Sequence, residues 1–344
     1  MENNENLNVA TPQEESYSPI RYGLGAILAF FGFSSKTHRA SKKRAKLVGD
    51  IFTYAVLLFG SFLMVYPFWW MVAGSFALTN ITGTGNAILN RMVWWPSIST
   101  FNTELNAAGG FRNYAEVFNR AFPRIAKGFT FWRALGNNLL YSIVPVVIGV
   151  ITSASAAFSF AKIQWIGRNA VFYFLLAAIM VPGPSIMVSQ FVMYDNMGWR
   201  NNGLVLIIPG MFGSIMTAFF IRQFLFGLPT SIIEAAKIDG AGYFRIFCGF
   251  ILPLAMPAIM AQGILSFMGC WNNYMGSFIM IPKGPSINLP HAIALMEDGG
   301  SGAYSGDFGV VIAASVVCIL PVMILFACFQ NLIIGSLMLT GSKE

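Results

Sequence analysis

Residue types that often carry catalysis or bind metals are few and scattered in this chain of 344 residues. The two histidines, His38 and His291, lie far apart, and the cysteines lack CxxC spacing, so neither a metal site nor a disulfide framework is expected. No HExxH, GxSxG or paired-carboxylate arrangement is present, and no GxxxxGK followed by Ser or Thr. We therefore expect no catalytic residue, no metal and no cofactor, and no ATP bound by the chain itself. The four cysteines are Cys248, Cys270, Cys318 and Cys328.

The segment 228–253 has the most specific pattern in the sequence. Ser231 and Glu234 stand three residues apart, as in a capping box, and predict the start of a short helix. Asp239 and Gly240 predict its end, because glycine adopts the positive φ of a helix C-terminus without strain. A second short helix and a return to apolar sequence at Pro253 follow.

Two helices of about eight residues each are too short to be stable alone in water. They nevertheless carry more large apolar side chains than a free loop should. The segment therefore needs a docking surface, which is either the rest of this chain or a second protein. The apolar side chains are those of Ile232, Ile233, Ile238, Tyr243, Phe244 and Phe247.

The composition indicates what surrounds this segment. Hydrophobic residues make up 56% of the chain and charged residues only 10%, against about 25% charge in a typical soluble domain. A soluble protein of this composition would lack a polar surface, and an aromatic content of 15% argues against disorder. We conclude that the chain is an all-α polytopic membrane protein.

A spanning helix needs about 20 residues without a costly charge, and the charge-free runs of the sequence allow six. The shorter apolar stretch Tyr22–Phe33 is interpreted as a helix lying on the membrane surface. The six spans are placed near 51–76, 138–161, 169–191, 203–224, 252–279 and 308–333. Pro182-Gly-Pro184 is interpreted as a kink in the third span.

Basic residues orient the six spans. Thirteen Lys and Arg fall on the side of the two termini, including the run Lys36–Lys46, whereas the short loops of the other side hold two, Arg200 and Lys283. By the positive-inside rule both termini are cytoplasmic, and the run 36–46 is interpreted as an anchor at the anionic inner leaflet. The long loop at 77–133 then lies outside.

The spans contain almost no titratable residues, and Asp195 and Asp307 fall at predicted ends. An ion-coupled transporter needs such groups within the membrane. If the chain transports actively, its energy must therefore come from another polypeptide.

The segment 228–253 resembles the EAA loop of binding-protein-dependent ABC importer permeases, a resemblance that extends over about residues 49–344. Glutamate and proline are 19 residues apart, as in that family; Phe250 replaces its usual isoleucine. Further sequences resemble the smaller membrane subunit of the maltose-type carbohydrate permeases. They are Arg222-Gln-Phe, Trp271-Asn-Asn-Tyr, Leu320-Pro-Val-Met-Ile-Leu-Phe and Gln330, with Trp94-Trp-Pro and Asn113-Tyr-Ala-Glu-Val-Phe outside.

The resemblance implies a type I importer fold in which the EAA loop is a coupling helix that sits in a cleft of a separate ATPase. It also implies a heterodimer with a second permease, two ATPase subunits that bind the ATP, and an external solute-binding protein in a bacterial cytoplasmic membrane. The coupling residues would be Glu234, Ala235, Ala236, Asp239, Gly240, Ala241, Phe247, Leu252 and Pro253.

The expected cargo is a carbohydrate, such as an oligosaccharide. Trp271, Asn272, Asn273 and Tyr274 either line its path or only pack the helices, and Arg222 is interpreted as snorkelling from a span end. A non-sugar solute such as glycerol phosphate, an ATP-independent secondary carrier and a non-transporting scaffold remain as alternatives.

Four regions are predicted along the chain. They are a cytoplasmic tail at 1–48, the first span with its external loop at 49–133, a permease core at 134–333 and a C-terminal tail at 334–344.

Overall fold

The computed structural model describes residues 40–76, 111–297 and 308–341, and in these residues it contains helices and no strands. The all-α prediction is therefore confirmed. The predicted surface helix Tyr22–Phe33, the external Trp94-Trp-Pro and Asp307 lie outside the described residues. The chain forms two compact units that divide within one helix, between Tyr66 and Pro67.

The first described helix, α2, runs from Ala40 to Gly74, and its residues up to Tyr66 belong to the first unit. Its stretch Leu47–Gly74 is long and apolar enough to cross a membrane. Apolar side chains such as Leu58 and Met64 are exposed there. Exposed apolar residues on every side of a helix of this length are expected where lipid is the solvent.

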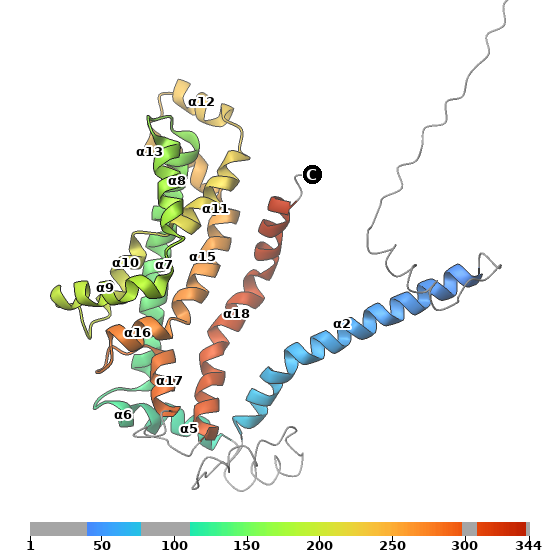
Figure 1. Cartoon of the computed structure of the whole chain (residues 1–344), viewed down its shortest axis with the longest axis vertical. Coiled ribbons are helices and arrows are strands. Elements are labelled where there is room, and N and C mark those ends of the chain that lie inside the picture. Colours follow the sequence, from blue (N-terminus) through green and yellow to red (C-terminus); the bar gives the residue numbers. More distant parts are fainter. Residues whose placement is uncertain (1–39, 77–110, 298–307, 342–344) are drawn as a thin grey trace, which may run out of the picture. The chain divides into compact units, whose positions relative to one another are not determined.

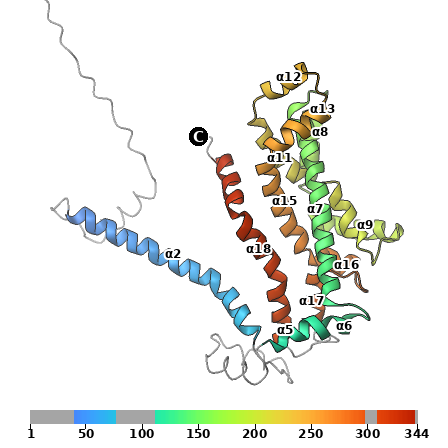
Figure 2. The ribbon, with the colours of Figure 1, turned by 180° about the vertical axis from the view of Figure 1, so that it is seen from behind.

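The second unit contains the other helices that the structure describes (Figures 1 and 2). In chain order they are α5 (Arg112–Glu116), η1 (Val117–Ala121), α6 (Phe122–Ile125), α7 (Phe131–Lys162), α8 (Arg168–Ala178), α9 (Gly183–Asn196), α10 (Leu204–Met211), α11 (Ile215–Phe226), α12 (Ser231–Ile238), α13 (Tyr243–Ile246), η2 (Phe247–Ile251), α14 (Leu252–Leu254), α15 (Met256–Trp271), α16 (Tyr274–Met280), α17 (Leu289–Glu297) and α18 (Phe308–Gly341).

The predicted number of six membrane spans agrees with the helices of the structure if each bent helix pair is counted as one span. Among the described residues, 4 helices are long and apolar enough to cross alone, and two bent pairs bring the number to 6. One pair is α8 with α9, bent by 92°, and the other runs from Tyr243 to Trp271 with a bend of 77°.

The bend in the third span lies at the Pro182-Gly-Pro184 sequence. The α8 helix ends at Ala178, and α9 begins at Gly183 after an extended Pro182. Proline lacks the N–H that would continue a helix and clashes with the preceding turn. As a result α9 lies across the direction of α8 (Figure 1), where the sequence predicted one helix over 169–191.

Two other predicted span boundaries are wrong. The helix predicted over 252–279 ends at Trp271, because the side chain of Asn273 accepts a hydrogen bond from the N–H of Gly276 and starts the new helix α16. The helix predicted from residue 138 begins at Phe131, where Thr130 caps the N–H of Arg133.

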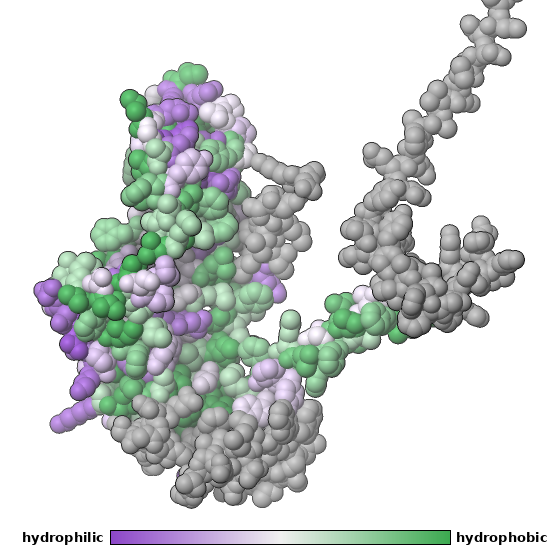
Figure 3. Space-filling model, viewed as in Figure 1, coloured by the Kyte–Doolittle hydropathy of each residue, from purple (hydrophilic) through white to green (hydrophobic). Residues whose placement is uncertain are grey.

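The second unit has two hydrophobic cores, one near each end. The first surrounds Trp271 and joins α5, α6 and α17 to α7 and α18, while the second lies beneath α12 and α13. Helices α10, α11 and α15 all pack on α7 between these ends. In Figure 3, hydrophilic residues lie over α12 and α13 and also near α9, while much of the surface between them is apolar.

Candidate functional site

The segment 228–253 forms a helix–turn–helix at one end of the second unit (Figures 1 and 2). The α12 helix is eight residues long, as predicted, and Tyr243–Leu254 follows as a second helix built from α13, η2 and α14. Its middle, Phe247–Ile251, is π-helical, a local widening that is frequent at functional sites.

The predicted capping box is not formed. The amides of Ile233 and Glu234 donate to the carbonyl of Thr230 over 3.0 and 3.2 Å, so the helix starts one residue earlier than expected. Ser231 therefore lies inside the first turn, where its hydroxyl cannot cap that turn, and Thr230 makes no side-chain capping bond. Glu234 therefore takes no part in a capping box and lies exposed on the surface.

The end of α12 matches the prediction. Gly240 has a φ of 79°. Its N–H donates to the carbonyl of Lys237 over 3.0 Å, and the N–H of Ala241 donates to that of Ala236 over 2.9 Å. These two bonds form a Schellman motif, which reverses the chain in a fixed direction.

One side of this segment packs on the rest of the chain. Ile233 and Ala236 of α12 are 3% exposed, and Ile246 and Phe247 of the second helix are also buried. The ring of Phe247 lies 5.7 Å from that of Phe158 in α7, centroid to centroid. The bundle therefore provides one of the docking surfaces that the short helices need.

The other side remains uncovered in the described structure. Ile238 is 87% exposed and Phe244 81% exposed, although both side chains are apolar. Glu234 and Asp239 are exposed on the same two-helix segment. We call the four residues Glu234, Ile238, Asp239 and Phe244 the coupling face, after the role that the sequence predicts for this segment. Large exposed apolar side chains with charged neighbours are typical of a surface that binds another protein.

Two lysines hold the segment in place. The Nζ of Lys162, the last residue of α7, donates to the carbonyl of Leu228 over 2.7 Å. The Nζ of Lys237 donates to the hydroxyl of Tyr243 over 3.0 Å and lies 4.6 Å from the centre of that ring. The first bond ties the segment to α7, and the second joins the two short helices.

The structure brings the predicted coupling residues together but divides them between two roles. Exposed residues can meet another protein, whereas buried residues attach the segment to the bundle. Glu234, Ala235, Asp239, Gly240 and Pro253 are exposed, Ala241 and Leu252 are half-buried, and Ala236 and Phe247 are buried.

The residues predicted for a transport path form hydrogen bonds and ring contacts with other residues of the same chain. Trp271 is completely buried, and its Nε1 donates to the carbonyl of Cys318 over 3.0 Å. The amide of Asn272 donates to the carbonyl of Met268 in its own helix, and Asn273 caps α16. Tyr274 is half-buried among aromatic rings. These contacts support the packing interpretation for Trp271 and Asn273.

Arg222 does not snorkel. It is 6% exposed, and its Nε donates to the carbonyl of Phe160 over 3.2 Å. Its guanidinium lies 3.9 Å from the ring centre of Phe172 and 4.6 Å from that of Phe226. A guanidinium packed on aromatic faces joins helices, so Arg222 fastens α11 to α7 and α8.

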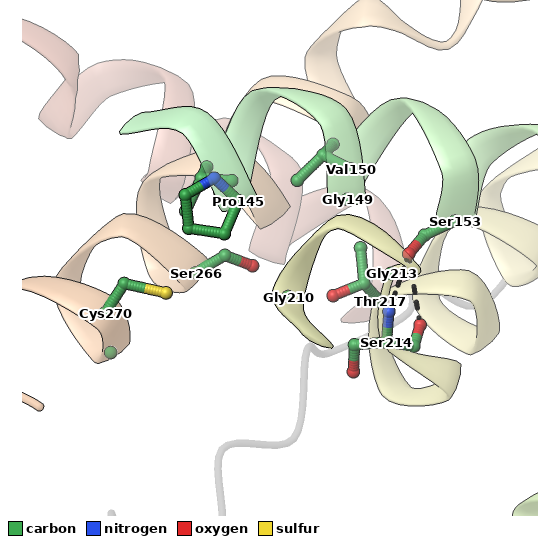
Figure 4. Close-up of a pocket in the computed structure, with 12 residues that line it drawn as sticks. Pro145, Gly149, Val150, Ser153, Gly210, Gly213, Ser214, Thr217, Ser266 and Cys270 are labelled. Carbon is green, nitrogen blue, oxygen red and sulfur yellow. Dashed lines mark hydrogen bonds between the residues drawn. The ribbon is translucent and has the colours of Figure 1, made fainter. Parts of the chain in front are cut away.

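A pocket that the sequence did not predict lies between α7, α15 and the break between α10 and α11 (Figure 4). Its volume is about 250 Å³, and most of its lining is Gly, Ser, Pro or Val. The sequence Gly210-Met-Phe-Gly213-Ser214 could have indicated this pocket, because two glycines and a serine within an apolar run favour a break in the helix.

Comparisons with known proteins agree with this architecture. Residues 146–337 match the family described as "Binding-protein-dependent transport system inner membrane component". The chain is 30% identical over 213 residues to an arabinooligosaccharide transport permease of Halalkalibacterium halodurans, covering 62% of this chain and 75% of that protein. It is 28% identical over 282 residues to a lactose transport permease of Rhizobium radiobacter, covering 82% and 92% of the two chains.

A solved structure has the same fold. It comes from a bacterial ABC transporter involved in the import of the acidic polysaccharide alginate. The TM-score is 0.65 at 19% sequence identity, and the match covers 87% of this chain and 99% of that one.

Proposed function

Because the chain belongs to the family of binding-protein-dependent transport system inner membrane components, we propose that it is a permease subunit of an ATP-driven importer for a carbohydrate. The chain is a multi-pass membrane protein. The observation that carries the proposal is the coupling face, which exposes Ile238 and Phe244 on a segment anchored to α7.

The proposed role of α12 is to transmit force from a separate ATPase subunit. Its exposed side would sit in a cleft of that subunit, with Glu234 offering a charge at the edge. Its buried side, through Ile233 and Ala236, packs in the same core as α7 and α11. A displacement of α12 would therefore move the spanning helices, since packed side chains resist independent sliding.

The proposed partners follow from this role. They are a second permease forming a heterodimer, two ATPase subunits that bind the ATP, and an external protein that delivers the cargo. Both chain termini and α12 would face the cytoplasm, on the side richer in Lys and Arg. The chain itself would bind no cofactor and catalyse no reaction.

The relatives support a carbohydrate as the cargo. The proteins compared above transport arabinooligosaccharides and lactose, and another relative belongs to a diacetylchitobiose uptake system of Streptomyces coelicolor. A phosphorylated cargo such as glycerol phosphate would favour Lys or Arg in its path. No charged residue lines the pocket between α7 and α15 in the described structure, which supports an uncharged solute.

Uptake by the reconstituted complex tests the proposal. Vesicles containing both permeases and the ATPases, supplied with loaded binding protein and internal ATP, should accumulate radiolabelled sugar. Glu234→Lys and Gly240→Pro should abolish uptake and weaken copurification of the ATPase, while the chain still inserts into membranes. Undiminished uptake in both variants would contradict the coupling role, and ion-driven uptake by the chain alone would establish a secondary carrier instead.

A further inference from the structure

The pocket between α7, α15 and the α10–α11 break is lined by both buried and exposed residues. Pro145, Val150 and Thr217 are buried, whereas Ser214 and Gly269 are exposed. Its volume of about 250 Å³ is below the ~300–1,000 Å³ of sites for drug-sized ligands. The space therefore suits one small ring better than an extended chain.

The break between α10 and α11 gives the pocket polar backbone groups inside an apolar span. Gly213 has a φ of 85°, and a side chain there would meet the Ser153 hydroxyl at 2.5 Å. That hydroxyl accepts from the N–H of Ser214 over 2.9 Å and lies 3.2 Å from the Ser214 carbonyl, to which it donates. Ser153, Gly213 and Ser214 all line the pocket, so this polar contact lies at its wall.

Two hydroxyl groups face each other across the same space. Thr217 of α11 is only 5% exposed. Its hydroxyl points into the pocket toward Ser266 of α15, and the Ser266 hydroxyl points back (Figure 4). Neither has a hydrogen-bond partner among the described residues. Both hydroxyls are therefore available to form hydrogen bonds with a polar occupant of the pocket.

We propose that this pocket binds one ring of a neutral polyhydroxylated cargo during its passage, an inference that rests on the proposed function. Thr217 and Ser266 supply hydrogen-bonding groups to ring hydroxyls. The C–H groups of Pro145 and Val150 contact the apolar face of the ring. An acyl chain would leave the polar groups unpartnered, and an ionic cargo would find no opposite charge.

Labelling of Cys270, which lines the pocket, tests this inference directly. In the complete reconstituted importer, Cys248, Cys318 and Cys328 are replaced by Ala, and the water-soluble thiol reagent methanethiosulfonate ethylammonium is added. Lactose serves as the probe if the wild-type complex takes it up; otherwise the transported disaccharide found in the uptake assay is used. Cys270 should react, and saturating sugar should slow the reaction by about tenfold or more, as expected for a mostly occupied site.

Pocket variants provide a second measurement on the same vesicles. Gly269 lines the pocket, and a Cβ there would meet no atom within 4 Å, so Gly269→Leu adds bulk beside the pocket without a backbone clash. It should lower uptake by about tenfold or more, while Gly263→Leu, on the same helix and also in open space, should not. Thr217→Val should lower uptake about 3- to 10-fold through loss of one hydrogen bond, and Thr217→Ser should restore it.

The outcomes separate the two proposals. Wild-type uptake with Cys270 labelled but not protected would overturn the sugar site and leave the importer function intact. Cys270 unreactive in the working importer would mean that lipid or a helix of the second permease fills the pocket, and would also overturn it. A complex that takes up no sugar would remove the proposed function, and this inference with it.

Discussion

If α12 is a coupling element, replacing two of its isoleucines by alanine should have opposite effects: one change should weaken ATPase binding, and the other should lower the stability of the chain. Ile238 is 87% exposed, whereas Ile233 is 3% exposed and packs in the core beneath α12. Ile238→Ala removes three side-chain carbons, each worth about 0.8 kcal/mol on burial. If docking buries the exposed part of this side chain, ATPase binding should weaken by about 2 kcal/mol, or about 30-fold in Kd.

The same change should leave the stability of the chain almost unaltered, because Ile238 makes little contact within it. Ile233→Ala is the matched control, and it should lower the free energy of unfolding by about 2–5 kcal/mol. The assay titrates the ATPase subunit onto the permease pair in lipid nanodiscs and follows thermal unfolding of each variant. A Kd for Ile238→Ala equal to that of the wild type would refute the assignment of the coupling face.

Three other substitutions test single features. Gly240→Val should impair ATPase binding more than Gly240→Asn, because Asn tolerates positive φ and a β-branched residue does not; equal binding by both variants would count against the Schellman turn. Arg222→Lys should destabilise the chain by about 1–2 kcal/mol in thermal unfolding through loss of its aromatic contacts and hydrogen bonds, and an unchanged unfolding temperature would contradict its fastening role. Burial lowers the pKa of His291 to about 4 from about 6.5 when unfolded. The unfolded state then binds more protons below pH 6.5, so stability should fall by about 1.4 kcal/mol per pH unit between pH 6.5 and 4, and His291→Gln should remove this slope; a slope that persists in the variant would assign it to other groups.

Local signals in the sequence predicted the parts of the fold that depend on neighbouring residues. The end of α12 follows from Gly240 alone, because few other residues adopt its positive φ. The bend in the third span follows from Pro182 and Pro184, whose rings exclude a continuous helix there. The number of spans follows from the charge-free runs.

Features that depend on residues distant in sequence were missed or misplaced. The bond from Lys162 to the carbonyl of Leu228 ties the segment before α12 to α7, and no local pattern in the sequence predicts it. The burial of Trp271 depends on its bond to the carbonyl of Cys318 in another helix, so the sequence could not separate packing from a role in the transport path. The pocket forms where α7, α11 and α15 pack together, and small residues in one helix do not predict which other helices pack against it.

The sequence also could not separate the two roles of the coupling residues. Glu234 and Ala236 stand two positions apart in one motif, yet Glu234 is exposed and Ala236 is buried, with 3% of its surface accessible. An eight-residue helix gives too short a period to fix its buried face without the partner helices. The structure resolves this through the contacts of Ile233 and Ala236 with the core.

A photo-crosslinking amino acid at position 238 tests the central claim most directly, with position 233 as the buried control. In the complete importer, held with ATP bound, the side chain at 238 should crosslink to the ATPase subunit, while the one at 233 should crosslink within its own chain. Crosslinks from 238 only to lipid or to this chain, in a complex that still imports sugar, would contradict the account.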